Sequence, residues 1–447
     1  MSPTLVTANE AAAAQPASAP PARSAAVDPA AVALAQRYRA IRERSLALAA
    51  PLSPEDAMLQ SMAEASPAKW HLAHTSWFFE QFVLALQRDY RAVDADWAYL
   101  FNSYYQSVGP MHARPQRGLL SRPSLTQVLD YRARIDERIA RALGSGDLDA
   151  KAQQRIELGL QHEQQHQELL LTDIKHAFWC NPLRPAYRDD LHQCIGSAPA
   201  PRWIGFDESL ATVGAPVWPG EDPAQSVPFA YDNESPRHRV LLPAYALAQH
   251  PVSNADYRAF IDDGGYRAPM LWLSEGWNRI NAEGWRRPLY WDDDLEREFT
   301  LGGVRAIDPA APVCHLSYFE ADAFARWAGA RLPTEFEWER MAAHEAVEGN
   351  LLEAGLLQPQ APPATAGMQQ AFGDVWEWTA SAYAPYPGFR PLPGALGEYN
   401  GKFMCGPWVL RGGSCATPRD HLRATYRNFF APSARWQFSG LRLARDA

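Results

Sequence analysis

The spacing of the apolar residues changes near residue 195, and this change divides the chain into two parts. Up to about residue 178, apolar residues recur every three or four positions in four long segments, which is typical of amphipathic helices. Beyond it, short runs rich in Trp, Gly and Pro favour short strands and ordered loops. Four amphipathic helices in succession predict a four-helix bundle. The predicted fold class is therefore α+β, with a helical bundle over residues 31–195 and a second domain over residues 196–447.

Residues typical of helix ends support the bounds of these segments. Ser66 followed by Pro67 is typical of an N-cap with proline at the first helical position, and Ser124 opens the third segment in the same way. The four segments are residues 29–49, 66–90, 124–143 and 152–178. Residues 97–123, between the second and third segments, contain Gly and Pro at a spacing that forbids a continuous helix and predicts a long loop. Residues 1–30 are rich in Ala, Pro and Ser and are predicted to be a disordered tail.

The second domain has few helical signals. One helix is predicted at residues 253–264 and a helix pair at residues 317–329 and 333–344. The last of these begins with a T-x-x-E capping box formed by Thr334 and Glu337. The remainder of the domain is predicted to consist of short strands and ordered loops.

Charge and cysteine content limit the partners and the compartment. A net charge of −9 argues against binding to nucleic acid or to an anionic membrane, because both need a basic face, and favours a small-molecule partner. The five cysteines are an odd number without C-x-x-C spacing, so a reducing cytoplasm is expected rather than a disulfide framework. No apolar run reaches the roughly 18 residues of a membrane span, and no signal peptide is evident.

The fourth helical segment carries His162-Glu163-Gln164-Gln165-His166, which matches the H-E-x-x-H pattern of zinc proteases. Histidines four residues apart on a helix share one face, with β-carbons roughly 5 to 6 Å apart, so both can bind one metal ion. The second segment offers His71 and His74 as a third ligand, and spacing alone does not choose between them. Residue type does not identify the metal either, because three imidazoles can bind zinc as well as iron.

A zinc metalloprotease is the first alternative, and it needs a third ligand beyond the second histidine. The longer protease pattern requires Gly and His where this chain has Leu169 and Thr172. A glutamate ligand on a following helix is also hard to place, because the helical pattern breaks soon after His176. The protease hypothesis is therefore disfavoured.

Several ordered motifs give the chain a specific resemblance. The pieces "SPAKWHLAHTSWFFE", "FNSYY", "HEQQHQELLLTDI", "GDVWEWT", "GEYNGKFM", "VLRGGSCATP" and "YRNFFAPSARWQFSGLRLARD" resemble the EgtB-like sulfoxide synthases of ergothioneine biosynthesis over about residues 35–447. The resemblance implies a DinB-like bundle followed by a domain of the formylglycine-generating-enzyme, or C-type-lectin-like, fold.

The same resemblance implies a non-haem Fe(II) enzyme that uses O2 to join a chalcogen donor to the imidazole ring of hercynine, the trimethyl betaine of histidine. The donor in the sulfur enzymes is cysteine or γ-glutamylcysteine, and the product is a sulfoxide. The closely similar selenoneine synthases attach a selenosugar instead.

Site residues follow from the resemblance position by position. The implied iron ligands are His74, His162 and His166, and Gln165 is implied to orient the substrate imidazole. A tyrosine of "FNSYY", Tyr104 or Tyr105, is implied as proton donor or redox partner, although both could simply pack the domain interface. The implied substrate-binding residues are Asn428 at the hercynine carboxylate, Phe429 and Phe430 beside the substrate, and Arg114, Arg117 and Arg435 as anchors for the donor.

The donor is left open by departures from the family pattern. The sulfur enzymes more often have a basic residue where Met111 stands and Asn-Gln where Gly406 and Pro407 stand, and the acidic residue that helps hold γ-glutamylcysteine is absent near Phe430. These departures keep a selenosugar beside the sulfur donors. A second alternative function is oxidation of a partner's cysteine by a formylglycine-generating-type centre, for which Cys405 and Cys415 would be the close pair.

Overall fold

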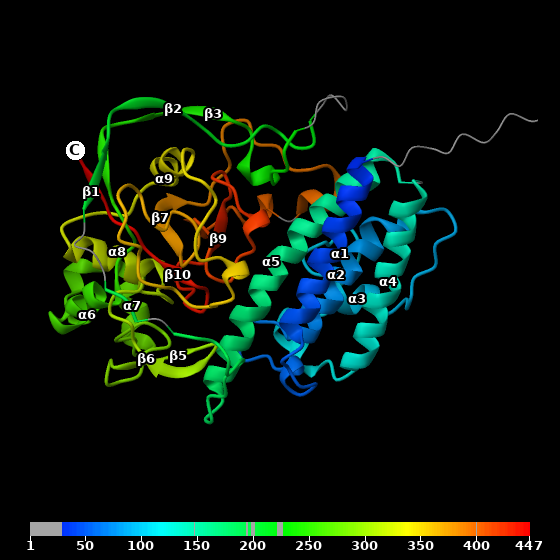
Figure 1. Cartoon of the computed structure of the whole chain (residues 1–447), viewed down its shortest axis with the longest axis horizontal. Helices are drawn as coiled ribbons and strands as arrows, with labels where there is room; N and C mark the ends of the chain where they lie inside the picture. The colour runs from blue at the N-terminus through cyan, green and yellow to red at the C-terminus, as the bar shows by residue number, and fades with distance from the viewer. Residues whose placement is uncertain (1–28, 147, 194, 198–201, 221–226, 399) are drawn as a thin grey trace, which may run out of the picture.

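A computed structural model describes residues 29–447 apart from 147, 194, 198–201, 221–226 and 399. The predicted tail lies almost wholly outside these residues. Figure 1 shows the helices of the N-terminal part side by side, and the strands with the remaining helices as a second body. The long helix α5 stands between them. No helix of the described residues is both long and apolar enough to cross a membrane.

The N-terminal part is a helical bundle. Its helices are α1 (Pro29–Ala49), α2 (Ala68–Phe82), α3 (Trp97–Phe101), α4 (Leu125–Ser145) and α5 (Ala150–Cys180). The predicted N-cap Ser124 of α4 is confirmed, and it forms a capping box: Ser124 accepts a hydrogen bond from the backbone N–H of Gln127, and the Gln127 side chain accepts from the backbone N–H of Ser124. The short helix α3 lies within the stretch that was predicted to be a loop.

Two details of the second helix differ from the prediction. Pro67 is the N-cap, and Ser66 instead donates its backbone N–H to Asp173 on α5 (2.8 Å). The helix ends at Phe82 and not at Tyr90. The carboxylate of Glu80 accepts from the Tyr90 hydroxyl and from the backbone N–H of Val93 (2.9 Å), which draws the following residues back along α2.

The second domain is built from short strands and helices. Its strands are β1 (Trp203–Phe206), β2 (Ser209–Val213), β3 (His238–Leu242), β4 (Tyr245–Ala248), β5 (Arg297–Thr300), β6 (Gly303–Ala306), β7 (Trp376–Ala382), β8 (Trp408–Arg411), β9 (Asn428–Phe430), β10 (Ser439–Gly440) and β11 (Ala444–Asp446). Its helices are α6 (Asn254–Asp262), α7 (Ser274–Ala282), α8 (Tyr318–Trp327) and α9 (Glu335–Ala342). The predicted capping box at Thr334 is confirmed.

The second domain has two larger sheets, and one of them carries residues that line the cavity described below. One has the strand order β10-β7-β8-β9, and the other has the order β1-β4-β11. Two further pairs are β2-β3 and β5-β6. Strand β7 begins with Trp376 and Trp378, which are both buried, as expected of core residues. Strand β9 carries Asn428, Phe429 and Phe430 at the edge of its sheet.

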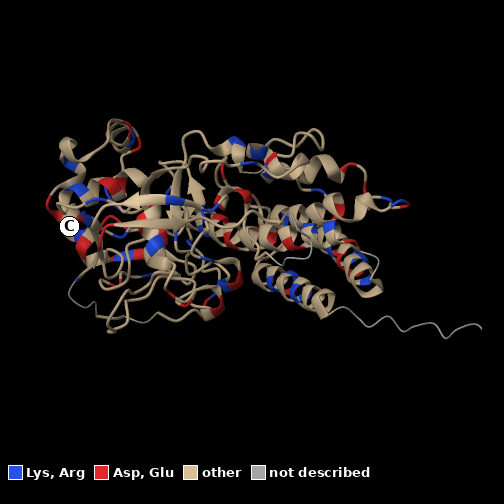
Figure 2. Cartoon of the chain, turned by 90° about the horizontal axis from the view of Figure 1, so that it is seen from above, with Lys and Arg blue, Asp and Glu red and all other residues tan. Residues whose placement is uncertain are grey.

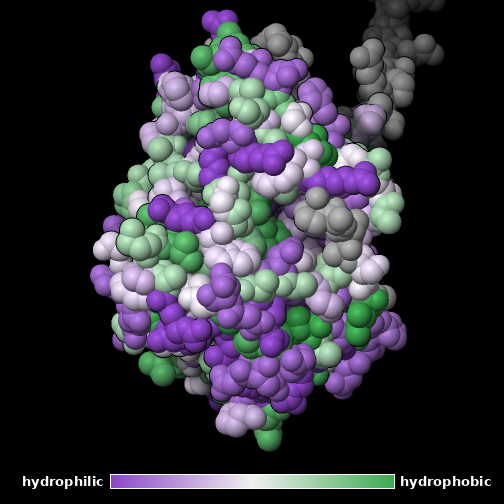
Figure 3. Space-filling view, turned by 90° about the vertical axis from the view of Figure 1, so that its left-hand side faces the viewer, coloured by the Kyte–Doolittle hydropathy of each residue, from purple (hydrophilic) through white to green (hydrophobic). Residues whose placement is uncertain are grey.

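The distribution of charged residues over the molecule is consistent with its modest net charge. Figure 2 shows acidic and basic residues interspersed over both parts of the molecule. On the face of the second domain seen in Figure 3, apolar areas are small and separated by hydrophilic ones. Such a surface is typical of a globular protein whose ligand enters a cavity.

Candidate functional site

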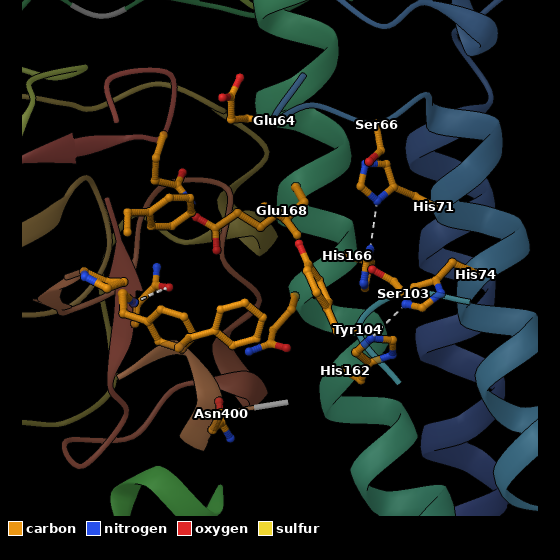
Figure 4. A pocket seen from close by; sticks show the side chains of 18 of the residues that line it. Glu64, Ser66, His71, His74, Ser103, Tyr104, His162, His166, Glu168 and Asn400 are labelled. Carbon is orange, nitrogen blue, oxygen red and sulfur yellow. Dashed lines mark hydrogen bonds between the residues drawn. The ribbon is translucent and has the colours of Figure 1, made fainter. Parts of the chain in front are cut away.

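A cavity of about 350 Å³ lies between the bundle and the second domain. The bundle contributes residues of α2, of α5, of the segment before α2 and of the loop that follows α3. The second domain contributes Tyr231, Asn233, Asn400, Phe403, Pro407, residues 426–431, Trp436 and Gln437. This volume suits a small molecule. Figure 4 shows the histidines on α2 and α5 on one side of it and Asn400 across from them.

Three histidines from two helices point their ring nitrogens at one place. One nitrogen from each of His74, His162 and His166 lies within 4.8 Å of the other two, and His74 Nε2 is 3.2 Å from His162 Nε2. Burial lowers the pKa of His162 to about 3 and holds the pKa of His74 well below its usual range. Both rings are therefore neutral at physiological pH, which is the form that binds metals.

Hydrogen bonds from the far side of two rings, those of His74 and His166, fix the tautomers of these histidines. The carbonyl of Phe101 accepts from His74 Nδ1 (2.6 Å), which leaves Nε2 with its lone pair. His71 Nε2 lies 3.1 Å from Asp173, and since a carboxylate only accepts, His71 Nδ1 must accept from His166 Nδ1 (2.8 Å). His71 thus stands behind His166, and of the two candidates on α2 it is His74 that joins the cluster.

Replacing His71 with phenylalanine is expected to weaken metal binding by about 10- to 100-fold, because His166 loses the group that orients its ring. The measurement is competition between the protein and a chelator for Fe(II) under anaerobic conditions. His176→Phe is the matched control, since His176 is on α5, the helix of His166, but its Nδ1 lies beside Ser61 (2.7 Å). Equal affinities for wild type and His71→Phe would contradict the orienting role.

Glu163 points away from the histidine cluster. It lies in a buried network with Arg42 (2.9 Å), Arg132 and Ser45 (2.6 Å). Burial by itself would raise the pKa of Glu163, but the Arg132 and Arg42 guanidiniums outweigh it and lower the pKa to about 2. A carboxylate engaged in this way is not the general base that a zinc protease requires.

The tyrosines of the loop after α3 both line the cavity. Tyr104 has a positive φ of 66°, and its hydroxyl accepts a hydrogen bond from the Arg114 guanidinium (2.6 Å). Its ring meets the ring of Phe403 edge to face, with centroids 5.0 Å apart. Tyr105 is buried against Trp77 and Phe82.

Glu398 and Lys402 of the second domain hold this loop, and we call the contact the tyrosine clasp. The Glu398 carboxylate accepts from the backbone N–H groups of Gln106 (3.0 Å) and Ser107 (2.9 Å) and from the Ser107 hydroxyl. The Lys402 ammonium donates to the carbonyl of Tyr104. The position of Tyr104, which is in the bundle, therefore depends on side chains about 300 residues away.

The residues expected around the substrate also line the cavity. Gln165 donates from Nε2 to the Tyr426 hydroxyl (2.8 Å). The side chain of Asn428 accepts from the backbone N–H of Phe429 (2.9 Å), and the Phe429 ring stacks on Tyr383 with centroids 4.1 Å apart. Phe430 contacts Trp436 edge to face. All four residues predicted to contact the substrate thus line the same cavity.

The three predicted donor anchors divide into two groups. Arg114 and Arg117 line the cavity, and no carboxylate of the described residues forms an ion pair with either. Burial, together with the charge of Arg114, lowers the pKa of Arg117 to about 9. Arg435 does not line the cavity: it pairs with Glu320 (2.8 Å) and its guanidinium lies 4.2 Å from the centre of the Trp285 ring. Because Glu320 and Trp285 engage its guanidinium, Arg435 is not available as an anchor for the donor.

Other residues of the cavity were missed from the sequence. Glu168 is buried and accepts hydrogen bonds from Trp376 (2.7 Å), Ser414 (2.6 Å) and Thr417 (2.9 Å) of the second domain. Burial raises the pKa of Glu168. The signal that could have revealed it is a polar stripe on α5, because Gln161, Gln165 and Glu168 recur at helical spacing within an otherwise buried segment.

The cysteines expected for a formylglycine-generating-type centre do not form a site here. Cys405 is exposed and Cys415 is buried, and neither lines the cavity. Both stand as free thiols among the described residues.

Two family descriptions match the two parts of the chain. Residues 37–170 match the DinB superfamily, and residues 217–359 and 353–447 match the sulfatase-modifying factor enzyme 1-like domain. Both descriptions agree with the predicted fold of the two parts, a DinB-like bundle followed by a formylglycine-generating-enzyme-like domain.

Curated relatives are similar to this chain over much of its length. A hercynine oxygenase from Mycolicibacterium thermoresistibile is 42% identical over 246 residues, which cover 49% of this chain and 54% of the relative. The hercynine oxygenase of Mycolicibacterium smegmatis is 37% identical over 321 residues, which cover 65% of this chain and 72% of the relative. Ergothioneine biosynthesis protein 1 from Schizosaccharomyces pombe is 26% identical over 276 residues, 55% of this chain and 34% of the relative. The chain thus spans about half the length of the first relative and over two thirds of the second, and with both domains in the expected order it belongs to the family of EgtB-like hercynine oxygenases.

Proposed function

We propose that the protein is an Fe(II)- and O2-dependent oxidoreductase that forms a carbon–sulfur or carbon–selenium bond on the imidazole ring of hercynine. The observation that carries the proposal is the convergence of three neutral imidazoles on one point of a cavity between the two domains. The relatives that are called hercynine oxygenases support the choice of substrate.

His74, His162 and His166 would hold the iron. Their neutral rings, and the fixed tautomers of His74 and His166, fit a divalent ion, and three protein ligands leave positions for other molecules. Bound iron would supply the redox chemistry for O2 and the chalcogen donor.

The wall formed by Gln165 and β9 suits hercynine. The amide of Gln165 can hydrogen-bond the imidazole ring, and Asn428, which also lines the cavity, can hydrogen-bond the carboxylate. The rings of Phe429 and Phe430 offer apolar faces to the trimethylammonium group, which aromatic rings attract.

Tyr104 or Tyr105 would serve as the proton donor. The hydroxyl oxygen of Tyr104 already accepts from Arg114, so its own hydrogen is directed elsewhere. A phenol held in this way can deliver a proton into the cavity.

The donor side of the cavity supports two kinds of molecule. Arg114 and Arg117 form no ion pair with a carboxylate of the described residues, and their guanidiniums suit the carboxylate of cysteine or γ-glutamylcysteine. A selenosugar is favoured by the residues that depart from the sulfur enzymes, because Pro407 lines the cavity and Met111 Sδ accepts from the backbone of Tyr104 (3.4 Å). Phe430 on this wall provides no charge for γ-glutamylcysteine.

A donor competition tests the proposal. Anaerobically iron-loaded protein is given O2 with hercynine and equal amounts of cysteine, γ-glutamylcysteine and selenosugar, and the products are separated by mass spectrometry. O2 uptake is expected only when hercynine and a donor are both present, with one donor dominating the adducts. O2 uptake without hercynine, or the absence of any hercynine adduct, would refute the assignment.

A further inference from the structure

A buried guanidinium lies behind one of the three histidines. Arg117 is 3% exposed, and its Cζ lies 3.4 Å from the centre of the Trp70 ring. Trp70 in turn stacks on His74, with ring centroids 4.5 Å apart and planes 13° apart. We infer that the fixed charge of Arg117 opposes further positive charge at the metal site and so holds bound iron in its ferrous form. The inference rests on the proposed function and gives Arg117 a role other than that of a donor anchor.

The order of the rings follows from helical spacing on α2. Trp70 and His74 are four residues apart and Trp77 is three residues further on, so the three rings lie on one face of the helix. The rings of His74 and Trp77 also stack, with centroids 5.5 Å apart and planes 15° apart. His74 thus lies against two indole rings. We call Arg117, Trp70, His74 and Trp77 the histidine stack.

Arg117 and His74 lie on opposite faces of Trp70. Both groups are so close to the centre of this ring, at 3.4 and 4.5 Å, that they would overlap if they shared one face. The π electrons of an indole attract a cation to the face of the ring. Because a guanidinium already occupies one face of Trp70, the ring stabilises positive charge on the His74 side less well.

Neutral hydroxyl groups hold the guanidinium in place. Its Nη1 donates to Ser66 Oγ (2.9 Å), and its Nη2 donates to Ser103 Oγ (3.0 Å). Figure 4 shows both serines on the side of the cavity that carries His74. No carboxylate of the described residues forms an ion pair with Arg117, and Asp173 attracts it only from farther away. With a pKa of about 9, Arg117 is protonated at neutral pH, so the site faces an uncancelled positive charge.

This charge matters when bound iron loses an electron. Oxidation from Fe(II) to Fe(III) adds one positive charge to a site whose three protein ligands are neutral imidazoles. Like charges repel more strongly where water is excluded, and the groups around a metal ion tune its reduction potential. Arg117 therefore raises the reduction potential of the Fe(III)/Fe(II) couple. We expect the site to keep its iron ferrous while hercynine and the donor are absent.

The test measures the reduction potential of this couple in the iron-loaded full chain, without hercynine and without donor. The protein is titrated with redox mediators, and Fe(III) is followed by electron paramagnetic resonance. Arg117→Gln is expected to lower the potential by at least about 59 mV, which is a tenfold shift of the equilibrium toward Fe(III). Arg117→Lys keeps the charge and is expected to recover more than half of that difference.

A second neutral variant separates charge from packing. Arg117→Met removes the charge but keeps an unbranched side chain that can cover Trp70. Its potential is expected to fall as far as that of Arg117→Gln, and it serves as the test if Arg117→Gln does not fold or does not retain iron.

Arg445→Gln is the matched control. Arg445 also lies over a tryptophan, with its Cζ 4.5 Å from the centre of the Trp203 ring. It is exposed on β11 and does not line the cavity. Its loss is expected to leave the potential of the iron unchanged.

The outcomes separate this inference from the proposed function. If wild type retains iron but takes up no O2 with hercynine and a donor, the proposed function fails, and the potentials still decide the role of Arg117. If both neutral variants keep the wild-type potential, or if Arg117→Lys falls as far as they do, the inference is refuted. Weaker binding of the donor without any change of potential would leave Arg117 as an anchor only and would overturn the inference too.

Discussion

Replacing His162 with alanine is expected to reduce metal affinity by more than about a hundredfold, the upper range for a residue that only supports a ligand. One of three imidazoles is then missing, and His74 and His166 alone hold the ion. The measurement is the iron content after anaerobic loading and gel filtration, together with hercynine-dependent O2 uptake. Both quantities are expected to fall close to the background.

His344→Ala is the control for this variant, because His344 is exposed at the end of α9 and outside the cavity. It is expected to retain full iron content. A His162→Ala protein that keeps its iron through gel filtration would remove His162 from the ligand set.

Glu163→Ala is expected to destabilise the bundle by about 3–5 kcal/mol, because it leaves two buried guanidiniums, Arg42 and Arg132, without their carboxylate. For a helical unit of this size that corresponds to a fall of about 10 °C in its melting transition. Calorimetry of the metal-free protein measures it. Since the pKa of Glu163 is lowered to about 2, the stabilisation is present above the ordinary carboxyl pKa and is lost as the pH falls toward 2.

The comparison for Glu163 is Glu137→Ala. Glu137 pairs with Arg141 on the surface of α4 (2.7 Å), and its loss is expected to cost less than about 0.5 kcal/mol. A Glu163→Ala protein that melts like wild type but has lost all activity would restore the reading of Glu163 as a base.

The bundle could be predicted well because its signals are local. The N-cap Ser124 of α4 and the histidine spacing on α5 depend on residues within one or two turns, and both appear as expected. The end of α2 could not be predicted, since it depends on Glu80 recruiting Tyr90 and Val93 after the helix has ended. Apolar residues continue at helical spacing past Phe82, so periodicity alone predicts a longer helix.

The half of the site that comes from the second domain was harder to foresee. Tyr426 stands two residues before Asn428 in "YRNFF", yet its role depends on Gln165, 261 positions earlier in the chain. Arg435 shows the opposite error: its charge suggested an anchor, but Glu320 and Trp285 engage its guanidinium. Which arginine faces a ligand is decided by partners that are distant in sequence.

Because of the tyrosine clasp, the two domains cannot be exchanged between relatives independently of each other. Glu398 and Lys402 shape a loop that belongs to the bundle, while the bundle carries the histidines. A chimera that joins this bundle to the second domain of a relative would keep the histidine cluster but lose the contacts that position Tyr104. We expect that exchanging the loop after α3 together with residues 394–404, as one cassette, would transfer donor choice between relatives where either segment alone would not.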